Sequence, residues 1–160
     1  MSSGNRHSPD DRDLCQRVIE LLKGLHSPDR QTYVHSISEL QSLDRTSAAD
    51  VLVGLLRDPD ADVRCDAAQA LLQVDSERTA EFVFPLLADT NPGVRSHVCG
   101  LLHDFGDRRA TPYLVEVLLR DPEGDVRLIA AWALGRVGDE SAIPALRHAQ
   151  ESDEGTDYEG

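Results

Sequence analysis

Histidine and cysteine are the residues of this sequence best suited to metal chemistry, but their spacing gives a metal site little support. Cys99 and His103 are four residues apart and share a face if the segment is helical, with His97 close by. Cys99, however, aligns with Ala68 and Ala131 in two similar segments, which indicates a packing position. A zinc site also needs four ligands in a closed geometry. We therefore expect no metal and no cofactor.

Motifs for covalent or phosphate chemistry are absent from the sequence. It contains no glycine-rich phosphate loop, no nucleophile elbow and no HExxH motif. The acidic run 58–62 superficially suggests a calcium loop, but it lacks the following glycine and the distant glutamate. Helix capping and solvation explain this run better. The sequence therefore favours a binding protein over an enzyme.

Three arginines, Arg64, Arg95 and Arg127, each follow a valine at the same place in similar segments. The planar guanidinium binds carboxylates through two parallel hydrogen bonds. We expect these arginines to form a structural ladder with acids near the turns, and an anion-binding stripe is the alternative. The predicted acidic members of the ladder are Asp58, Asp89 and Asp121.

Trp132 is the most informative candidate for binding. It lies roughly 200° around its predicted helix from the centre of the apolar stripe, on an arc shared with Leu128 and Ile129 and bordered by Arg136. Tryptophan and arginine are enriched at binding hot spots, and an exposed apolar patch on an acidic protein marks an interaction site. We expect a protein or peptide partner there, and cover by the terminal helix or by a second copy of the chain is the alternative.

The equivalent positions of the preceding segments contribute small or polar side chains to the same predicted surface. They are Gly100, His97, Asp104, Asp66, Gln69 and Gln73.

These positions follow from an internal repeat. A Leu-Leu pair, an Asp and a Val-Arg pair recur in 55–64, 86–95 and 118–127, at spacings of 31 and then 32 residues. Each unit predicts two helices joined by a short turn. Asp or Asn suits the N-cap of the second helix, and Pro92 suits its first turn. Gly106 and Gly138 are placed where a left-handed residue closes a helix.

One stripe with a period of 3.6 residues supports this assignment, because apolar residues follow Val126 at steps of 4, 7, 8 and 11. One repeat domain is expected over 13–151, with disordered tails at 1–12 and 152–160. Its first pair places Glu39 at a position that is apolar in later units and is expected to act as a cap. The predicted helices are 14–26 with 29–43, 47–57 with 60–74, 78–88 with 91–105, 110–120 with 123–137, and a last one at 141–151.

The most regular unit, Asp121–Asp139, has the pattern D-P-x-x-x-V-R followed by A-A-x-A-L-G-x-x-G-D. This pattern resembles the HEAT-like repeats of phycobilin lyases. The resemblance implies an all-α fold, an α-solenoid in which about four antiparallel helix pairs and a terminal helix form a right-handed superhelix. It also implies a concave face made by the second helices, where partners bind. A subunit or chaperone of a bilin lyase-like or other HEAT-repeat enzyme system is the alternative function.

Charge limits the possible partners. The 160-residue chain has a net charge of -13, from 29 acids against 16 bases, which disfavours nucleic acid and favours a partner with a basic segment. No apolar run approaches the roughly 18 residues of a membrane span, and we expect no signal peptide. The three cysteines are widely spaced, which favours reduced thiols and a cytoplasmic protein. Genomic base composition and adaptation to high salt both account for the single lysine, Lys23.

Overall fold

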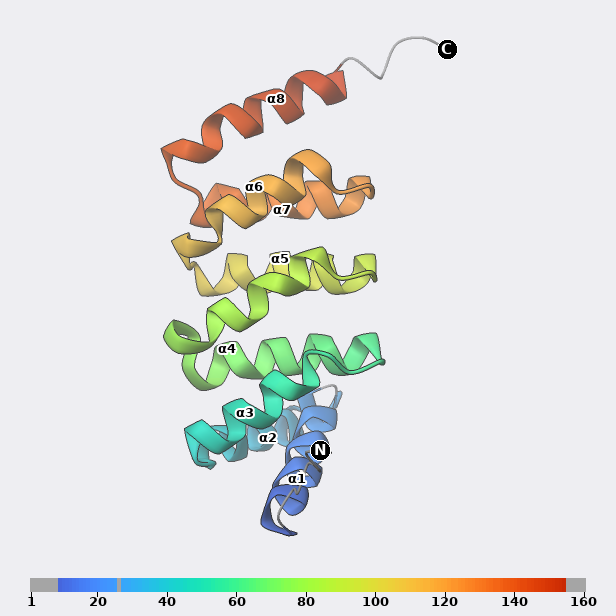
Figure 1. Cartoon of the computed structure of the whole chain (residues 1–160), viewed down its shortest axis with the longest axis vertical. Helices are drawn as coiled ribbons and strands as arrows, with labels where there is room; N and C mark the ends of the chain where they lie inside the picture. Colours follow the sequence, from blue (N-terminus) through green and yellow to red (C-terminus); the bar gives the residue numbers. More distant parts are fainter. Residues whose placement is uncertain (1–8, 26, 155–160) are drawn as a thin grey trace, which may run out of the picture. The chain divides into compact units, whose positions relative to one another are not determined.

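A computed structural model describes residues 9–25 and 27–154, and in these ranges every regular element is helical (Figure 1). The predicted all-α repeat fold is therefore confirmed. The elements are α1 (Pro9–Leu25), α2 (Arg30–Ser42), α3 (Arg45–Leu55), α4 (Ala61–Val83), η1 (Phe84–Ala88), α5 (Pro92–Phe105), η2 (Arg108–Ala110), α6 (Thr111–Arg120), α7 (Gly124–Val137), η3 (Glu140–Ala142) and α8 (Ile143–Glu154), where η marks a 3-10 helix.

The chain forms two compact units, Met1–Thr79 and Ala80–Gly160. In the first unit, α1 packs against α2 and α3. Val18 and Leu22 of α1 are buried, as are Leu40 of α2 and Leu52 of α3. The expectation of one domain over 13–151 stays a prediction, and we describe each unit separately.

The first helix pair carries the charge that sets it apart from later repeats. Glu39 of α2 forms an ion pair with Arg17 of α1, and both side chains are partly exposed. A carboxylate is tolerated at this position because it stays in contact with water and with a cation. This agrees with the expectation that the first pair is atypical.

The second unit is built from two layers of helices. Helix α5 lies against α7, and α6 lies against α7, α8 and η1. Figure 1 shows α5 and α8 on opposite sides of the α6–α7 pair. The apolar stripe predicted for α7 is buried as expected, with exposed fractions between 0% and 3%. Its members are Val126, Ala130, Ala133, Leu134 and Val137.

Helix α5 begins and ends with the residues that the sequence predicts. The Asn91 side chain accepts a hydrogen bond from the Gly93 backbone N–H, and Pro92 is the first helical residue. Gly106 closes the helix with a φ of 70°, in the left-handed region.

The same expectation for Gly138 is wrong. Its backbone is extended, with φ -63° and ψ 155°. A Cβ atom at Gly138 would lie 2.4 Å from the carbonyl oxygen of Leu134 and 3.3 Å from the Cβ of Ala142. Glycine is therefore required here because a side chain would overlap the last turn of α7, and not for a positive φ.

The helix break predicted between residues 74 and 78 is absent. Separate helices over 60–74 and 78–88 are wrong, because α4 continues from Ala61 to Val83 and only then gives way to η1. The chain has Asp75 where the sister repeats have Gly106 and Gly138, so no glycine ends the helix there. Pro85 accompanies the change to the 3-10 helix.

The predicted tails overlap the terminal helices. Helix α1 already begins at Pro9 and α8 continues to Glu154, so 9–12 and 152–154 are helical rather than disordered. The rest of both predicted tails lies outside the described residues. Among the helices described, none is long and apolar enough to cross a membrane.

Candidate functional site

The turns between paired helices repeat one hydrogen-bonding pattern, in which an aspartate binds the backbone two residues ahead. The Asp58 Oδ1 accepts from the Asp60 N–H at 2.9 Å, and the Asp89 Oδ1 accepts from the Asn91 N–H at 2.8 Å. The third repeat has the same hydrogen bond, in which the Asp121 Oδ1 accepts from the Glu123 N–H at 3.0 Å. The predicted acids of the ladder therefore shape the turns.

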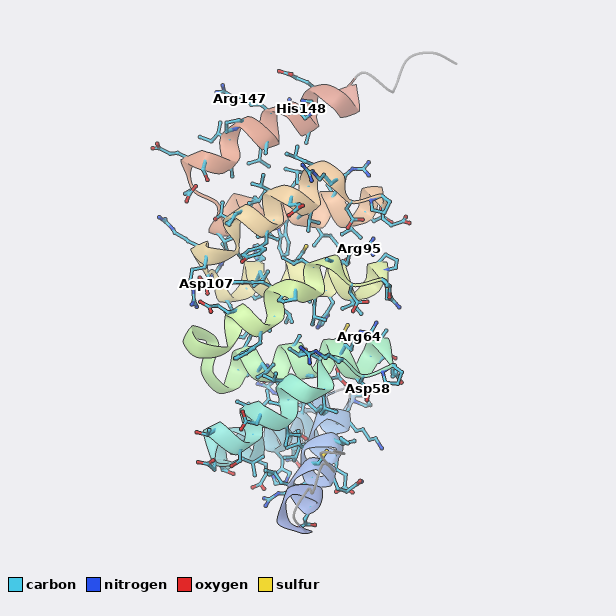
Figure 2. The ribbon with its side chains drawn as sticks, viewed as in Figure 1. Asp58, Arg64, Arg95, Asp107, Arg147 and His148 are labelled. Carbon is cyan, nitrogen blue, oxygen red and sulfur yellow. The ribbon has the colours of Figure 1, made fainter. Side chains whose placement is uncertain are left out.

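The arginine six residues later fixes the same turn from the other side. In each case, Nη1 donates to the carbonyl oxygen of the aspartate, over 2.7 to 2.9 Å. The labelled side chains of Asp58 and Arg64 lie beside this turn in the first unit (Figure 2). The donor and acceptor pairs are Arg64 with Asp58, Arg95 with Asp89, and Arg127 with Asp121.

Arg95 also links consecutive repeats of the second unit. Its Nε donates to Oδ2 of Asp121 at 2.6 Å, and its Nη2 donates to Oδ1 at 2.8 Å. Both residues are only 8% exposed. The predicted two-pronged contact with a carboxylate is present here, and all three arginines additionally bind backbone carbonyls, which the sequence analysis did not anticipate.

The ion pair stabilises the charged form of both partners. The hydrogen bond from Arg95 holds the pKa of Asp121 below 3.8, against the opposing effect of burial. The hydrogen bond to Asp121 in turn raises the pKa of Arg95 above its usual value. Asp121 also accepts from the Glu123 N–H. One carboxylate therefore both stabilises its own turn and binds the arginine of the preceding repeat.

Trp132 and Leu128 lie on the outer side of α7. Their exposed fractions are 55% and 69%, and Arg136 is exposed next to them. This placement follows the periodicity of the sequence, which assigns them to the arc opposite the buried stripe. That these residues bind a partner stays a prediction.

A stacked partner of Trp132 escaped the sequence analysis. The His103 imidazole of α5 lies 3.5 Å from the indole, between ring centroids, and the two planes differ by 14°. His103 Nδ1 is 3.0 Å from Oδ1 of Asp104. The sequence carries no local signal for this pair, because the contact depends on how α5 and α7 are offset along each other. The stack fixes the indole and leaves its other surface open.

The other predicted surface residues separate into exposed and flanking positions. Asp104 is exposed, whereas Ile129, His97 and Gly100 are half-buried. A Cβ atom at Gly100 would meet nothing within 4 Å, so there is open space next to this glycine. The exposed face of α5 and α7 is thus centred on Trp132, Leu128, Arg136 and Asp104; we call it the second-helix face.

The positions on α4 belong to the first unit. The expectation that Asp66 is exposed is wrong, because it is 8% exposed. It occupies the repeat position of His97 and Ile129, at the flank of the buried stripe rather than on the outer arc. Gln69 and Gln73 are half-buried, and among the described residues the Gln73 Oε1 has no hydrogen-bond partner.

Cys99 is a packing residue, as its alignment with alanine predicts. Its side chain is 0% exposed, and burial raises the pKa of the thiol to about 12. The thiol is therefore neutral near pH 7, whereas metal binding and nucleophilic attack require the thiolate. Within the described ranges, no group of three or more His, Cys, Asp or Glu residues could hold a metal ion.

Two grooves lie in the second unit. One, of about 520 Å³, runs between η1 and α6, and its walls include Phe84, Tyr113, Glu81 and Glu116. The Phe84 and Tyr113 rings stack with centroids 4.9 Å apart. The other, which we call the C-terminal groove, measures about 680 Å³ and lies between the end of α6, the start of α7 and α8. Its walls include Leu119, Arg127, Leu128, Ala131, Leu146 and His148.

A family model for HEAT repeats matches this chain over 18–91 and again over 80–158. These two matches span most of the 160 residues and agree with the periodicity of the helices.

Two curated bacterial proteins are similar to most of the chain. One, from Geobacillus stearothermophilus, is described as "Uncharacterized protein in gldA 3'region"; it is 31% identical over 146 residues, which cover 89% of this chain and 56% of that protein. The other is the epoxyqueuosine reductase of Bacillus subtilis, 29% identical over 144 residues, which cover 88% of this chain and 31% of the reductase. The chain thus spans about half or less of the length of these relatives.

Among solved structures, the crystal structure of an engineered protein is similar to this chain, with a TM-score of 0.47 and 23% identity. The match covers 83% of this chain and 68% of the engineered one.

Proposed function

The chain belongs to the HEAT-repeat family, and from that premise we propose that it is a non-catalytic scaffold that binds a protein or peptide on its second-helix face. HEAT-type repeats present extended surfaces for partners, because each repeat buries its core against its neighbours and leaves the outer arc free. The single observation that carries the proposal is the exposure of Trp132 and Leu128 side by side on a strongly acidic chain.

The stack on His103 supports this role for Trp132. A tryptophan held by a neighbouring ring loses less side-chain freedom when a partner covers it, so more of the contact energy remains as affinity. Arg136 and Asp104 at the border offer one charge of each sign for selection. An apolar centre bordered by charged side chains is also the arrangement of typical protein interfaces, in which a partner buries the centre and the polar rim stays in contact with water.

The net charge supports a partner segment that carries basic residues. A chain of charge -13 attracts cations over about 10 Å at moderate salt, which speeds the encounter more than it strengthens the complex. Association should therefore slow with added salt while dissociation changes little.

Replacing Trp132 tests the proposal directly. Immobilised wild type and Trp132→Ala are exposed to lysate of the native host, and captured proteins are quantified by mass spectrometry. Phe82→Ala is the matched control, because Phe82 is also an exposed aromatic residue of the second unit, at 50%, but lies on α4. We expect one protein that wild type and the control retain and Trp132→Ala loses.

Affinity of the purified partner then gives the magnitude. Truncating a hot-spot tryptophan costs about 2 kcal/mol or more, which weakens binding at least about 30-fold. Equal capture by all three proteins would contradict the proposal. So would light scattering that shows a dimer in wild type and a monomer in Trp132→Ala, because self-association would then explain the exposed indole.

A role within an enzyme system is the second candidate, and the similarity to epoxyqueuosine reductase favours it. The matched part is under a third of that reductase, and in this function the chain would act as a subunit or chaperone of a catalytic partner. Stable co-purification with the reductase of the native host would support this function. A bilin lyase-like role would instead give an absorbance shift when a bilin is added to the purified chain.

A further inference from the structure

The groove of about 520 Å³ between η1 and α6 lies away from the second-helix face, and we call it the first-helix groove. Its described walls come mainly from the end of α4, from η1 and from α6, and none of them belongs to α7. Figure 1 shows α6 in front of α7, which places the groove and the second-helix face on different sides of the unit. A group bound in this groove therefore uses a different surface from a partner of Trp132.

The apolar part of the first-helix groove is an aromatic pair. Phe84 is 4% exposed and stacks on Tyr113, with ring centroids 4.9 Å apart and planes that differ by 26°. Phe84 covers one face of the Tyr113 ring, whereas Tyr113 itself remains 46% exposed. Among the described walls, these two residues are the only aromatic ones. One open ring held from behind suits a flat cation better than a quaternary ammonium, which prefers a cage of several rings.

A carboxylate lies next to each ring of this pair. Glu116 is three residues after Tyr113 on α6, and Glu81 is three residues before Phe84, at the end of α4. Residues three apart lie on the same face of a helix. Both acids line the groove, and their side chains are 73% exposed for Glu81 and 66% exposed for Glu116. They are therefore accessible to a group that stacks on Tyr113.

The arginines of the chain that contact these two acids hold them weakly. Arg109 Nη1 is 3.4 Å from Glu81, but Arg109 Nη2 is 2.7 Å from Asp107, which is its main partner. Arg120 Nη1 is 3.5 Å from Glu116, and the Arg120 side chain is 78% exposed. Exposed ion pairs at such distances contribute little to stability. An incoming cation can therefore replace both arginines at low cost.

The described walls of the groove also carry more acidic than basic residues. Arg95 binds the carboxylate of Asp121, so the charges of these two residues compensate each other. The net charge of -13 attracts cations to the chain as a whole. The groove is thus complementary to a positively charged group. Its acidic wall residues are Glu81, Asp89, Glu116 and Asp121, and its basic ones are Arg95 and Arg120.

A guanidinium matches the ring and the acids at the same time. It is planar, stacks on aromatic faces and directs its N–H groups outward in its own plane, whereas an ammonium is a compact point charge. We propose that the first-helix groove binds an arginine side chain of a partner protein, with the guanidinium stacked on Tyr113 and its N–H groups bound to Glu81 and Glu116. Binding at this site does not require Trp132.

The smallest probe is Nα-acetyl-argininamide, which presents the side chain between two peptide-like groups. It is titrated into the full chain, labelled with ¹³C in the tyrosine and phenylalanine rings, and the ring resonances are followed by NMR. We expect saturable shifts at Tyr113 and Phe84, with a Kd on the order of 1 mM for a single side chain. Tyr33 of α2, in the first unit, should not shift.

Three related compounds define which part of the probe is recognised. Nα-acetyl-lysinamide should bind several-fold more weakly, because an ammonium cannot stack and bridge two carboxylates together. Nα-acetyl-citrullinamide has nearly the same shape without the charge and should give no saturable shift. Free arginine should also bind more weakly, because the acids repel its own carboxylate. This last comparison distinguishes an arginine within a protein from the amino acid.

Two double variants separate the site from the general charge of the chain. Glu81→Gln with Glu116→Gln should weaken the binding of Nα-acetyl-argininamide about tenfold. Glu140→Gln with Glu151→Gln is the matched control, because it removes the same charge from exposed positions of the same unit that are not among the described walls. This control should bind like wild type.

Tyr113→Leu tests the ring. Leucine keeps an apolar side chain next to Phe84 but removes the aromatic platform, so the saturable shift at Phe84 should be lost. Circular dichroism verifies that this variant and both double variants are folded.

Four results would overturn the proposal. The first is the absence of a saturable shift at Tyr113 in wild type, and the second is equal binding of the arginine and citrulline compounds. The third is equal weakening by the two double variants, which would indicate attraction by net charge alone. The fourth is binding that appears only after Arg78→Gln, because an arginine of α4 would then occupy the groove itself.

Discussion

Asp121→Asn should be among the most destabilising single-atom changes in the second unit. Asparagine keeps Oδ1, which accepts from the Glu123 N–H and from Nη2 of Arg95, but it turns Oδ2 into an N–H₂ donor that faces the Arg95 Nε. One charged hydrogen bond is lost, and a cation that is 8% exposed keeps no opposite charge. Breaking one partner of such a pair costs about 3 kcal/mol.

The assay uses the intrinsic tryptophan. Trp132 is the single tryptophan of the chain and belongs to the unit that contains the ion pair, so its fluorescence during urea unfolding reports on that unit. Asp58→Asn is the matched control. Asp58 occupies the same repeat position as Asp121, its side chain is half-buried, and asparagine would still accept the hydrogen bond from the Asp60 N–H. This control should lose about 0.5 kcal/mol or less, as exposed changes usually do.

The pH dependence gives the sign of the effect independently. The folded pKa of Asp121 is lowered below 3.8, so the ion pair contributes its full stability above the unfolded value and loses it as pH falls through the folded pKa. The gap between wild type and Asp121→Asn should stay constant from pH 7 to about 4 and close below 3.8. A loss under about 1 kcal/mol at pH 7, or one equal to that of Asp58→Asn, would refute the reasoning.

Three further results are expected from the local structure. Gly138→Ala should destabilise the chain by about 2 kcal/mol in urea, because its Cβ would overlap the carbonyl oxygen of Leu134; Gly135→Ala, with open space around it, should stabilise α7 by about 0.5 kcal/mol. Cys99 should resist iodoacetamide at pH 8 until urea unfolds the chain, because its thiol has a pKa of about 12, and rapid labelling of the folded chain would contradict its burial. Acrylamide should quench Trp132 readily in the free chain, since the residue is 55% exposed; a protected indole would mean that another copy covers it.

The sequence predicts those parts of the fold that depend on the spacing of apolar residues along each helix. Each second helix buries a stripe of Val, Ala and Leu, and this stripe also fixes which side of α7 is outward. Trp132 could therefore be placed on the exposed arc without coordinates. The cap at Asn91 and the left-handed Gly106 are equally local, because a single residue type meets a single backbone requirement.

Features that depend on a neighbouring element escaped the prediction. Gly138 is needed because a Cβ atom there would overlap the carbonyl oxygen of Leu134 in the last turn of α7 and lie against the Cβ of Ala142 in η3, and the repeat pattern does not distinguish this from a left-handed cap. Helix α4 continues past Val74, where the sequence analysis ended it by analogy with later repeats, because Asp75 stands in place of their glycine. Predicting the stack of Trp132 on His103 would have required the offset between α5 and α7, because this offset decides which of their residues meet.

The aspartate of the repeat turn has two functions that the sequence motif does not separate. One is local, because its side chain binds the N–H two residues ahead, and serine at position 27 performs this function equally well. The other is between repeats, because the carboxylate accepts hydrogen bonds from the arginine of the preceding repeat, as Asp121 does from Arg95. Ser27 retains the local function alone, because a hydroxyl cannot receive an arginine through two parallel hydrogen bonds as a carboxylate does.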